Sequence, residues 1–229
     1  MRAHTNNKEL KHPCTTRFAS NFLMLQSILN VESELRILVA SSDWRGLDYN
    51  KKDIAREVTN IIQITEFRSQ GHEVLLVLEP LVRVLRLVDG DGSTARYLYE
   101  AMERAKEAIQ QRCGNNQEKY IRMWELFEGR RTQNIIHPIH CAAAFLNPAY
   151  MYSGTFTENR EMKEGISFIL ENLVDLEEKI EFMGQVQLYR MKLSSLFTET
   201  AMTMLKTSHP RIWWDYCGDS LPVLKKYAI

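Results

Sequence analysis

The chain has 229 residues, of which 45% are hydrophobic and 25% charged, which is ordinary for a globular protein and argues against a wholly disordered one. Its 29 basic and 29 acidic side chains give a net charge of zero. A stand-alone DNA-binding domain is usually basic, because neutralising phosphates supplies much of its affinity. Any contact with DNA is therefore expected to be local, or shared with another part of the protein.

The four cysteines lie far apart in the chain, at Cys14, Cys113, Cys141 and Cys217. Without a Cys-x-x-Cys pair a zinc ribbon is not expected. The polar N-terminus does not resemble a secretory signal, which favours a reducing intracellular compartment. No run of about 18 apolar residues occurs, so no membrane partner is expected.

Residues 1–14 are mostly polar and are expected to be disordered or irregular. From Thr16 onward, apolar side chains recur at three- and four-residue steps, which is typical of amphipathic helices. A break is expected at 41–46, and Pro80 is expected to kink or restart its helix. The predicted helices are 16–39, 50–62, 70–88, 94–112, 117–128, 135–146, 160–181, 185–205 and 210–217. No segment alternates strictly between apolar and polar residues, so the predicted fold class is all-α, a helical bundle.

The segment 160–181 is predicted to be one long amphipathic helix. Its apolar side chains follow a helical period and are expected to form one buried face; they are Ile166, Ile169, Leu170, Leu173, Leu176 and Ile180. Its carboxylates are expected to form a solvated acidic face; they are Glu171, Asp175, Glu177, Glu178 and Glu181.

The C-terminal stretch begins with a short aromatic helix. Pro210 suits a first helical turn, which has no use for the missing N–H. Trp213, Trp214 and Tyr216 are expected to supply a large buried aromatic area. Gly218 is expected to close this helix in the left-handed conformation.

A second short helix is predicted to follow. Asp219 or Ser220 is expected to cap it, with Pro222 just inside its first turn. The sequence stops soon afterwards at Ile229, so Leu224 and Ile229 are expected to lack packing partners. Trp213, Trp214, Gly218 and Pro222 are the predicted structural residues of this unit.

Two motifs resemble metal sites without completing one. Asp89, Asp91, Ser93 and Glu100 match positions of a calcium loop, but Thr94 stands where such a loop needs glycine. The alternative is a turn in which Asp91 or Ser93 caps the next helix.

His137 and His140 are three residues apart, and Cys141 follows directly. A zinc site needs about four ligands, which are not visible nearby. The proline between the histidines favours a helix start, with packing and capping roles. No metal and no cofactor is therefore expected.

Several segments in chain order carry a family resemblance: TTRFASNFLMLQS from Thr15, EPLVRVLRLVD from Glu79, YEAMERAK from Tyr99, HPIHCAAAFLNP from His137, and the stretch from Ser208 to Ile229. The first resembles a Thr-Arg-Trp-x-Ser segment, and the fourth a His-Pro-x-His-x-Ala-Ala-x-x-Leu-Asn-Pro segment, of hAT-superfamily transposases. The last resembles the start of their C-terminal region. The similarity is greatest to the transposase-like proteins abundant in plant genomes, and it extends from about Thr15 to Ile229.

The resemblance implies a ribonuclease-H-like core that is interrupted by a long helical insertion. Residues 15–207 would correspond to the insertion domain and 208–229 to the start of the dimerisation region. In the family, three carboxylates hold two catalytic metal ions. Two precede the Thr-Arg-Trp segment and one follows the Trp-Trp unit, so all three would fall outside this chain. The chain is therefore expected to be non-catalytic and to show no DNA cleavage.

The resemblance also implies a nuclear location, DNA as a partner and a possible homodimer through the C-terminal region. Arg17 and Phe18 match the family's Arg-Trp pair, whose aromatic ring stacks on a base near the transposon end. A flat ring on a splayed-out base is worth about 1–3 kcal/mol. Phe18 is the smaller ring and lacks the N–H, and the alternative is that Phe18 is simply the first core residue of its helix. The alternative function is a structural helical protein-interaction module with no DNA role.

Overall fold

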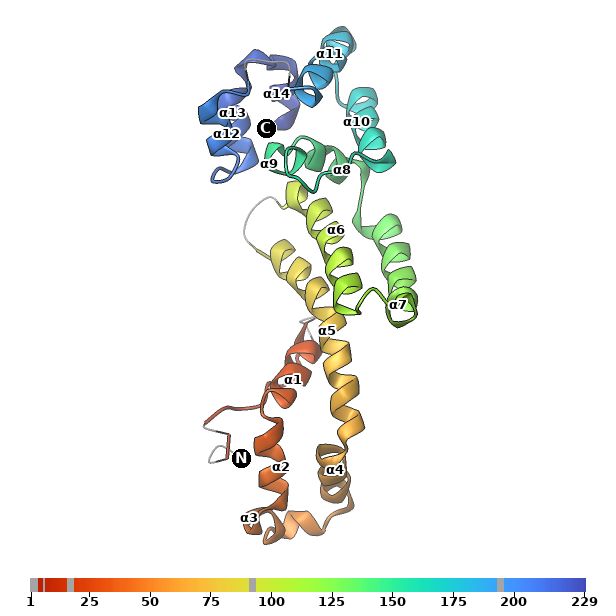
Figure 1. The fold of residues 1–229 in the computed structure, drawn as a ribbon, viewed down its shortest axis with the longest axis vertical. Coiled ribbons are helices and arrows are strands. Elements are labelled where there is room, and N and C mark those ends of the chain that lie inside the picture. The colour runs from red at the N-terminus through yellow and green to blue at the C-terminus, as the bar shows by residue number, and fades with distance from the viewer. Residues whose placement is uncertain (1–3, 6, 16–18, 91–93, 193–195) are drawn as a thin grey trace. The chain divides into compact units, whose positions relative to one another are not determined.

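The computed structural model describes residues 4–5, 7–15, 19–90, 94–192 and 196–229. In these residues it contains fourteen α-helices and no strand, which confirms the all-α fold class (Figure 1). The chain forms two compact units. The first comprises residues 1–83 and 108–120, and the second comprises 84–107 and 121–229. The family-based boundaries at 15 and 208 stay predictions.

The first unit is built around the N-terminal part of a long helix. Its helical segments are α1 (Ser20–Leu29), α2 (Glu32–Ala40), α3 (Ser42–Arg45), the 3-10 turn η1 (Asp48–Lys51), α4 (Asp53–Gln63), most of α5 (Thr65–Val88), the end of α6 (Ala95–Arg112) and the start of α7 (Gln117–Arg130). Gly71 lets α1 approach α5, because a Cβ there would lie 3.0 Å from Leu29 Cδ1. The buried Arg68 on α5 also pairs with Glu32 on α2, with Nε and Oε1 2.8 Å apart.

The prediction of one continuous helix over 16–39 is wrong. It is two helices, α1 and α2, separated at Asn30 and Val31. Asn30 is a weak helix former and ends α1, while Val31 leaves the helical conformation and is buried. In contrast, α5 runs through Pro80 as one helix and begins five residues earlier than predicted, at Thr65.

The second unit holds the ends of α5 and α7 and most of α6. Its other segments are the π-helical turn η2 (Arg131–Ile135), α8 (Pro138–Phe145), α9 (Pro148–Met151), α10 (Arg160–Asn172), the 3-10 turn η3 (Leu176–Glu178), α11 (Lys179–Arg190), α12 (Glu199–Met204), α13 (Pro210–Cys217), the 3-10 turn η4 (Gly218–Ser220) and α14 (Pro222–Ala228). Helices α8 and α10 touch backbone to backbone at Gly165, where a Cβ would lie 2.6 Å from the Ala142 nitrogen. Their apolar faces and those of α11, α13 and α14 share one core.

Two further helix predictions are corrected in this unit. The predicted helix 160–181 ends at Asn172, and the chain turns through Leu173 to Asp175 before η3 and α11 begin. This turn carries Val174 into the core. The predicted helix 185–205 is also interrupted, because α11 ends at Arg190 and Lys192 has a positive φ of 54°. A new helix, α12, begins after Thr198, whose side chain accepts the Ala201 N–H.

Among the described residues, no helix combines the length and the apolar character that a membrane crossing requires.

Candidate macromolecule-binding surfaces

The predicted Trp-Trp unit lies inside the core of the second unit. Trp213 is 1% exposed and Trp214 is 0% exposed. Each indole N–H finds a backbone carbonyl: Trp213 donates to Ala201 at 2.8 Å and Trp214 donates to Leu146 at 2.7 Å. Both rings are therefore buried, and both indole N–H groups have hydrogen-bond partners, within this unit. They are not available to stack on a ligand.

Three expectations for the C-terminal stretch are wrong. Tyr216 is 75% exposed, because it lies on the outer face of α13. Gly218 has a φ of −79° rather than the left-handed conformation. It is needed for space, since a Cβ would lie 2.9 Å from the Trp214 ring. Leu224 is fully buried and does not lack partners.

The start of α14 also differs in detail from the prediction. Pro222 occupies the first turn as expected, but Leu221, not Asp219 or Ser220, is the residue before the helix. Leu221 is fully buried and has no capping side chain. The helix start is therefore set by packing of Leu221 instead of a side-chain cap.

The predicted nucleic-acid contact, Arg17 and Phe18, lies outside the described residues, as do Asp91 and Ser93 of the calcium-like motif. Helix α1 begins shortly after the pair, at Ser20. Ser20 Oγ donates to the Cys14 carbonyl at 2.8 Å, which ties the described part of the N-terminal segment to α1.

The two neighbouring histidines form a helix cap. His137 precedes α8, and its Nδ1 accepts the Ile139 N–H at 3.4 Å. His140 Nδ1 accepts the His137 N–H at 2.9 Å, which completes a reciprocal capping box. In the described part of the chain, no group of three or more His, Cys, Asp or Glu side chains is arranged to hold a metal ion.

A buried ion-pair network surrounds Arg131, which sequence reasoning missed. Arg131 is 2% exposed and donates from Nη1 and Nη2 to Glu161, at 2.8 Å each. Nη2 also donates to Glu103 at 2.8 Å. Tyr99 donates to Glu161 at 2.8 Å and accepts from Asn159 at 2.6 Å. The partners come from three helical segments far apart in the sequence, so no local spacing reveals them.

The electrostatics of this network favour fixed charges. Burial lowers the pKa of Arg131, but the Glu161 hydrogen bonds and the surrounding carboxylates outweigh it and raise that pKa above its ordinary value. Hydrogen bonding from Arg131 in turn lowers the pKa of Glu161. Burial raises the pKa of Tyr99. None of these groups changes charge near neutral pH, so the network suits stabilisation rather than proton transfer.

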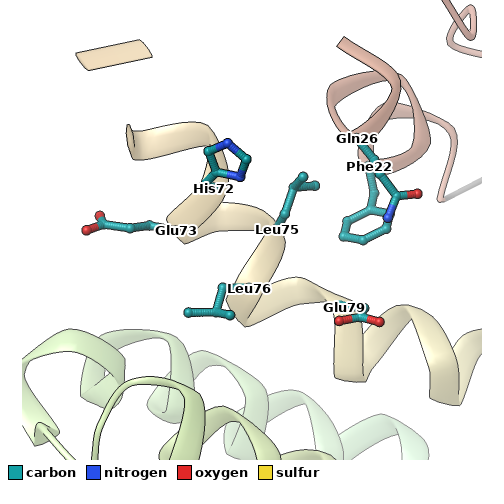
Figure 2. Close-up of a pocket in the computed structure, with 7 residues that line it drawn as sticks. All are labelled: Phe22, Gln26, His72, Glu73, Leu75, Leu76 and Glu79. Carbon is teal, nitrogen blue, oxygen red and sulfur yellow. The ribbon is translucent and has the colours of Figure 1, made fainter. Parts of the chain in front are cut away.

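A groove of about 360 Å³ lies between α1 and α5 in the first unit. Figure 2 shows Phe22 and Gln26 on α1 facing Leu75 and Glu79 on α5. Glu79 accepts hydrogen bonds from Arg83 and Arg112, and these bonds lower its pKa. The ionised carboxylate in this groove does not favour a phosphate ligand.

A group of basic side chains gathers at the start of α6 and of α13 in the second unit. Arg96 and Tyr97 lie in the first turn of α6, and the Tyr97 ring meets the His209 ring edge-on, with 5.7 Å between the centroids. Burial first, and then the charges of Arg96 and Arg211, lower the pKa of His209. Arg96 and Arg211 are therefore the two cations of this group, since the lowered pKa leaves His209 neutral near neutral pH.

The most exposed apolar side chains of the second unit lie at the turn between α10 and α11. Leu176 is 83% exposed and Ile180 is 88% exposed, while Leu173 and Met183 are exposed to a lesser degree. We call these four residues the apolar stripe. Leu176, Ile180 and Met183 follow one another at four- and three-residue steps through η3 and α11, so they share one side of that segment. Leu173 lies just before the turn.

The stripe adjoins a cleft of about 240 Å³ between α10 and α11. Its apolar lining comes from both helices and from α8: Phe145, Met162, Ile166, Leu170, Met183 and Val186. Met183 belongs to both the stripe and the cleft, and Leu170 lies one helical turn from Leu173. Stripe and cleft therefore meet at Met183. The cleft also has polar lining: Glu158, Lys163, Ser167, Gln187 and Arg190.

The apolar stripe is also where the predicted burial of helix 160–181 is wrong. A continuous helix would have kept Leu176 and Ile180 on the buried face with Ile166 and Ile169. The turn after Asn172 ends that register, so Ile169 and Val174 enter the core while Leu176 and Ile180 face solvent. The apolar period correctly indicates helix, but it carries no sign of the turn at 173–175 that redirects the side chains.

Comparisons of the chain with models of known protein families, with curated proteins and with solved structures find no match.

Proposed function

We propose that this chain is a helical docking module of a hAT transposase-like protein, without a catalytic role of its own, and that its principal ligand is another protein. The apolar stripe is the observation that carries this proposal. Monomeric proteins rarely expose contiguous large apolar side chains, and such surfaces mark interaction sites. Covering Leu176 or Ile180 fully would contribute about 1.5–3 kcal/mol each.

Two features support the other parts of the proposal. The order of the hAT-like segments along the chain supports the family, and an all-α fold is what a helical insertion would have. The carboxylates around Arg131 support a non-catalytic role, because ion pairs and hydrogen bonds engage Glu103 and Glu161. The nuclear location rests on the family resemblance alone and is part of the same proposal.

Calorimetric titration with an amphipathic helical peptide of about 18 residues, or five turns, tests the protein-docking role. The parent chain is expected to bind it, and the Leu176→Lys/Ile180→Lys variant is expected to lose at least about tenfold in affinity, or 1.4 kcal/mol. Leu126→Lys is the matched control, because Leu126 is an exposed apolar residue of the same unit, on α7. Equal binding by the parent and the double variant would contradict the proposal.

A second candidate function is DNA binding, and the two guanidinium groups of Arg96 and Arg211, which both act on His209, favour it. Arg17 and Phe18 would add the contact that the family resemblance implies. Binding to hairpin or single-stranded DNA should then weaken with salt through counterion release. Phe18→Ala should reduce affinity and Phe18→Trp should raise it, with folding checked for both. Absence of DNA binding would refute the DNA role, whereas equal binding by the parent and both folded variants would refute the Phe18 contact alone.

The homodimer through the C-terminal region stays a proposal as well. Since Trp213 and Trp214 face the core of their own unit, the exposed apolar side chains of α13 are Ile212 and Tyr216. Sedimentation of the parent against Ile212→Lys/Tyr216→Lys tests this dimer. A monomeric parent would refute it.

A further inference from the structure

The cleft between α10 and α11 is bounded at both ends by contacts that can be followed along the chain. At one end, the turn at 173–175 joins the C-terminus of α10 to η3 and α11. At the other end, Glu158, which lies shortly before α10, forms an ion pair with Arg190, the last residue of α11. The two helices therefore lead in opposite directions along the cleft, and each end of the cleft has its own lining residues.

The end of the cleft at this ion pair is polar and carries an excess of positive charge. Lys163 in the first turn of α10 lines it together with Gln187 and Arg190 in the last turn of α11. Among the described residues, Lys163 has no carboxylate partner. Arg190 donates from Nη2 to Glu158, while its buried Nε has no acceptor in the same part of the chain. Two cations thus meet one carboxylate in the described lining.

The opposite end of the cleft is apolar. Leu170 in the last turn of α10 and Met183 on α11 line it close to the turn between the helices. Between the two ends, Ile166 and Val186 provide apolar walls, and the buried Phe145 lines the cleft from α8. The lining therefore changes from charged to apolar along α10, over a helical rise of about 10 Å.

We propose that this cleft binds a small amphipathic carboxylate, a monoanion whose single carboxylate ends an unbranched apolar chain. The carboxylate would accept charge-assisted hydrogen bonds from Lys163 and Arg190. The chain would lie between Ile166 and Val186 and end at Leu170, where its burial is favourable. The cleft volume of about 240 Å³ lies just below the roughly 300–1,000 Å³ of drug-sized ligand sites, so the ligand is small. This site goes beyond the proposed docking function, because it depends on the cleft and not on the exposed stripe.

The lining disfavours other classes of occupant. A cationic amphiphile would bring its ammonium group against Lys163, and like charges repel. A neutral apolar molecule would leave the donors of Lys163 and Arg190 without an acceptor. A polar dianion such as free phosphate would not fill the apolar end, and Glu158 would repel it more strongly than a monoanion. A protein helix is about 10–12 Å wide with its side chains, so it would lie over the cleft and not within it.

Octanoate, octanol and octylammonium serve as probes, because they share one chain and differ in the charge of the head group. Each is titrated into the isotope-labelled protein, and binding is followed by the shifts of backbone amide signals in NMR spectra. The signals of α10 and α11 should move most. At low salt, octanoate should bind about fivefold more tightly than octanol, which equals about 1 kcal/mol and is the upper range for an ion pair open to solvent. Octylammonium should bind more weakly than octanol.

Substitutions in the lining provide the second arm, with unfolding midpoints to show that each variant is folded. Lys163→Met should abolish the preference for octanoate over octanol. Lys206→Met is the matched control and should keep that preference, because Lys206 is an exposed lysine of the same unit outside the lining. Glu158→Gln should strengthen octanoate binding, because it removes a lining carboxylate and leaves the charge of Arg190 to the ligand. Met183→Ala should weaken octanoate and octanol alike, because it shortens the apolar lining.

Octanoate binding at α10 and α11 whose preference over octanol depends on Lys163 would support the proposal. Failure of octanoate to bind the parent, or equal binding of octanoate and octanol, would overturn it. A preference that Lys163→Met retains, or signal shifts confined to other helices, would overturn it as well. The docking function is tested separately, by the peptide titration of Leu176→Lys/Ile180→Lys, so either proposal can fail without the other.

Discussion

Arg131 and Glu161 form a two-pronged ion pair in the second unit, with both Nη–Oε distances at 2.8 Å. The pair joins the turn η2 to the first turn of α10. Glu103 adds α6 to the same guanidinium, at 2.8 Å. One buried cation thus holds together three segments that are far apart in the sequence. The contribution of these ion pairs to the free energy of unfolding can be measured by substitution.

Arg131→Met should destabilise the protein strongly. The methionine roughly fills the space, but it leaves Glu103 and Glu161 without their common partner. Removing one member of a buried ion pair typically costs about 3–5 kcal/mol, because the remaining charge is uncompensated. Urea unfolding followed by circular dichroism measures this loss.

Arg104→Met provides the control on the same helix as Glu103. Arg104 is largely exposed and pairs with Glu100 one turn away, at 2.5 Å. Exposed pairs contribute about 0–1 kcal/mol, so this variant should unfold close to the parent. If both variants lost a similar free energy of unfolding, the Arg131 network would stabilise the protein no more than an exposed ion pair does.

Gly165→Ala should separate α8 from α10. The added Cβ would lie 2.6 Å from the Ala142 nitrogen and 2.7 Å from the Pro138 oxygen, and both are backbone atoms that cannot move aside cheaply. Overpacking of this kind costs about 1–3 kcal/mol. The free energy of unfolding should fall accordingly.

The matched control is Gly184→Ala in α11. A Cβ at Gly184 has no atom within 4 Å, and alanine is favoured over glycine inside a helix by about 0.5–1 kcal/mol. The two variants should therefore shift stability in opposite directions. A gain in stability from Gly165→Ala would contradict the close approach of the two helices.

The helical period in the sequence located most helices because each has an apolar face toward a core. Helix α6 at Ala95–Arg112 and α13 at Pro210–Cys217 agree closely with the predictions 94–112 and 210–217. The proline after His137 indicated a helix start there, but the predicted range 135–146 began too early, because α8 starts at Pro138 and Ile135 belongs to η2. Such local signals act within a few residues and need no knowledge of the tertiary structure.

Helix breaks and exposure were harder to predict, for a physical reason. The turn at Leu173–Asp175 contains neither glycine nor proline, and it exists because Val174 gains burial in the core. Gly218 is required by the Trp214 ring rather than by its own backbone angles. The Arg131 network likewise depends on residues brought together from distant segments. Each of these features is decided by tertiary packing, which a local pattern does not contain.

Trp213→Ala and Trp214→Ala should each lower the free energy of unfolding by about 3–5 kcal/mol, as expected for truncating a well-packed aromatic. Both rings are buried and share the core with Tyr189 and Phe197. Trp214→Phe keeps part of the packing but leaves the Leu146 carbonyl without its indole donor, so it should lie between the parent and Trp214→Ala. Unfolding midpoints equal to the parent in both alanine variants would show that the rings do not support the core.

Stability should fall as pH drops through the range in which histidine titrates. Burial first, and then the nearby His137, lower the pKa of His140 below its ordinary value of about 6.5. The unfolded chain therefore takes up the proton at a higher pH than the folded one. The stabilising contribution is fully present above the unfolded pKa and is lost as pH falls toward and through the folded pKa. Protonation at Nδ1 also removes the acceptor that holds the His137 N–H at 2.9 Å.

His140→Gln isolates this effect. Glutamine at this position can still reach back to the His137 N–H, as in an ordinary capping box, but it does not titrate. Urea midpoints at about pH 7.5 and pH 5 should differ less in the variant than in the parent. His209, whose pKa is also lowered, contributes in the same direction, so the variant should lose part of the pH dependence. Parallel losses in parent and variant would show that the cap at α8 does not titrate in this range.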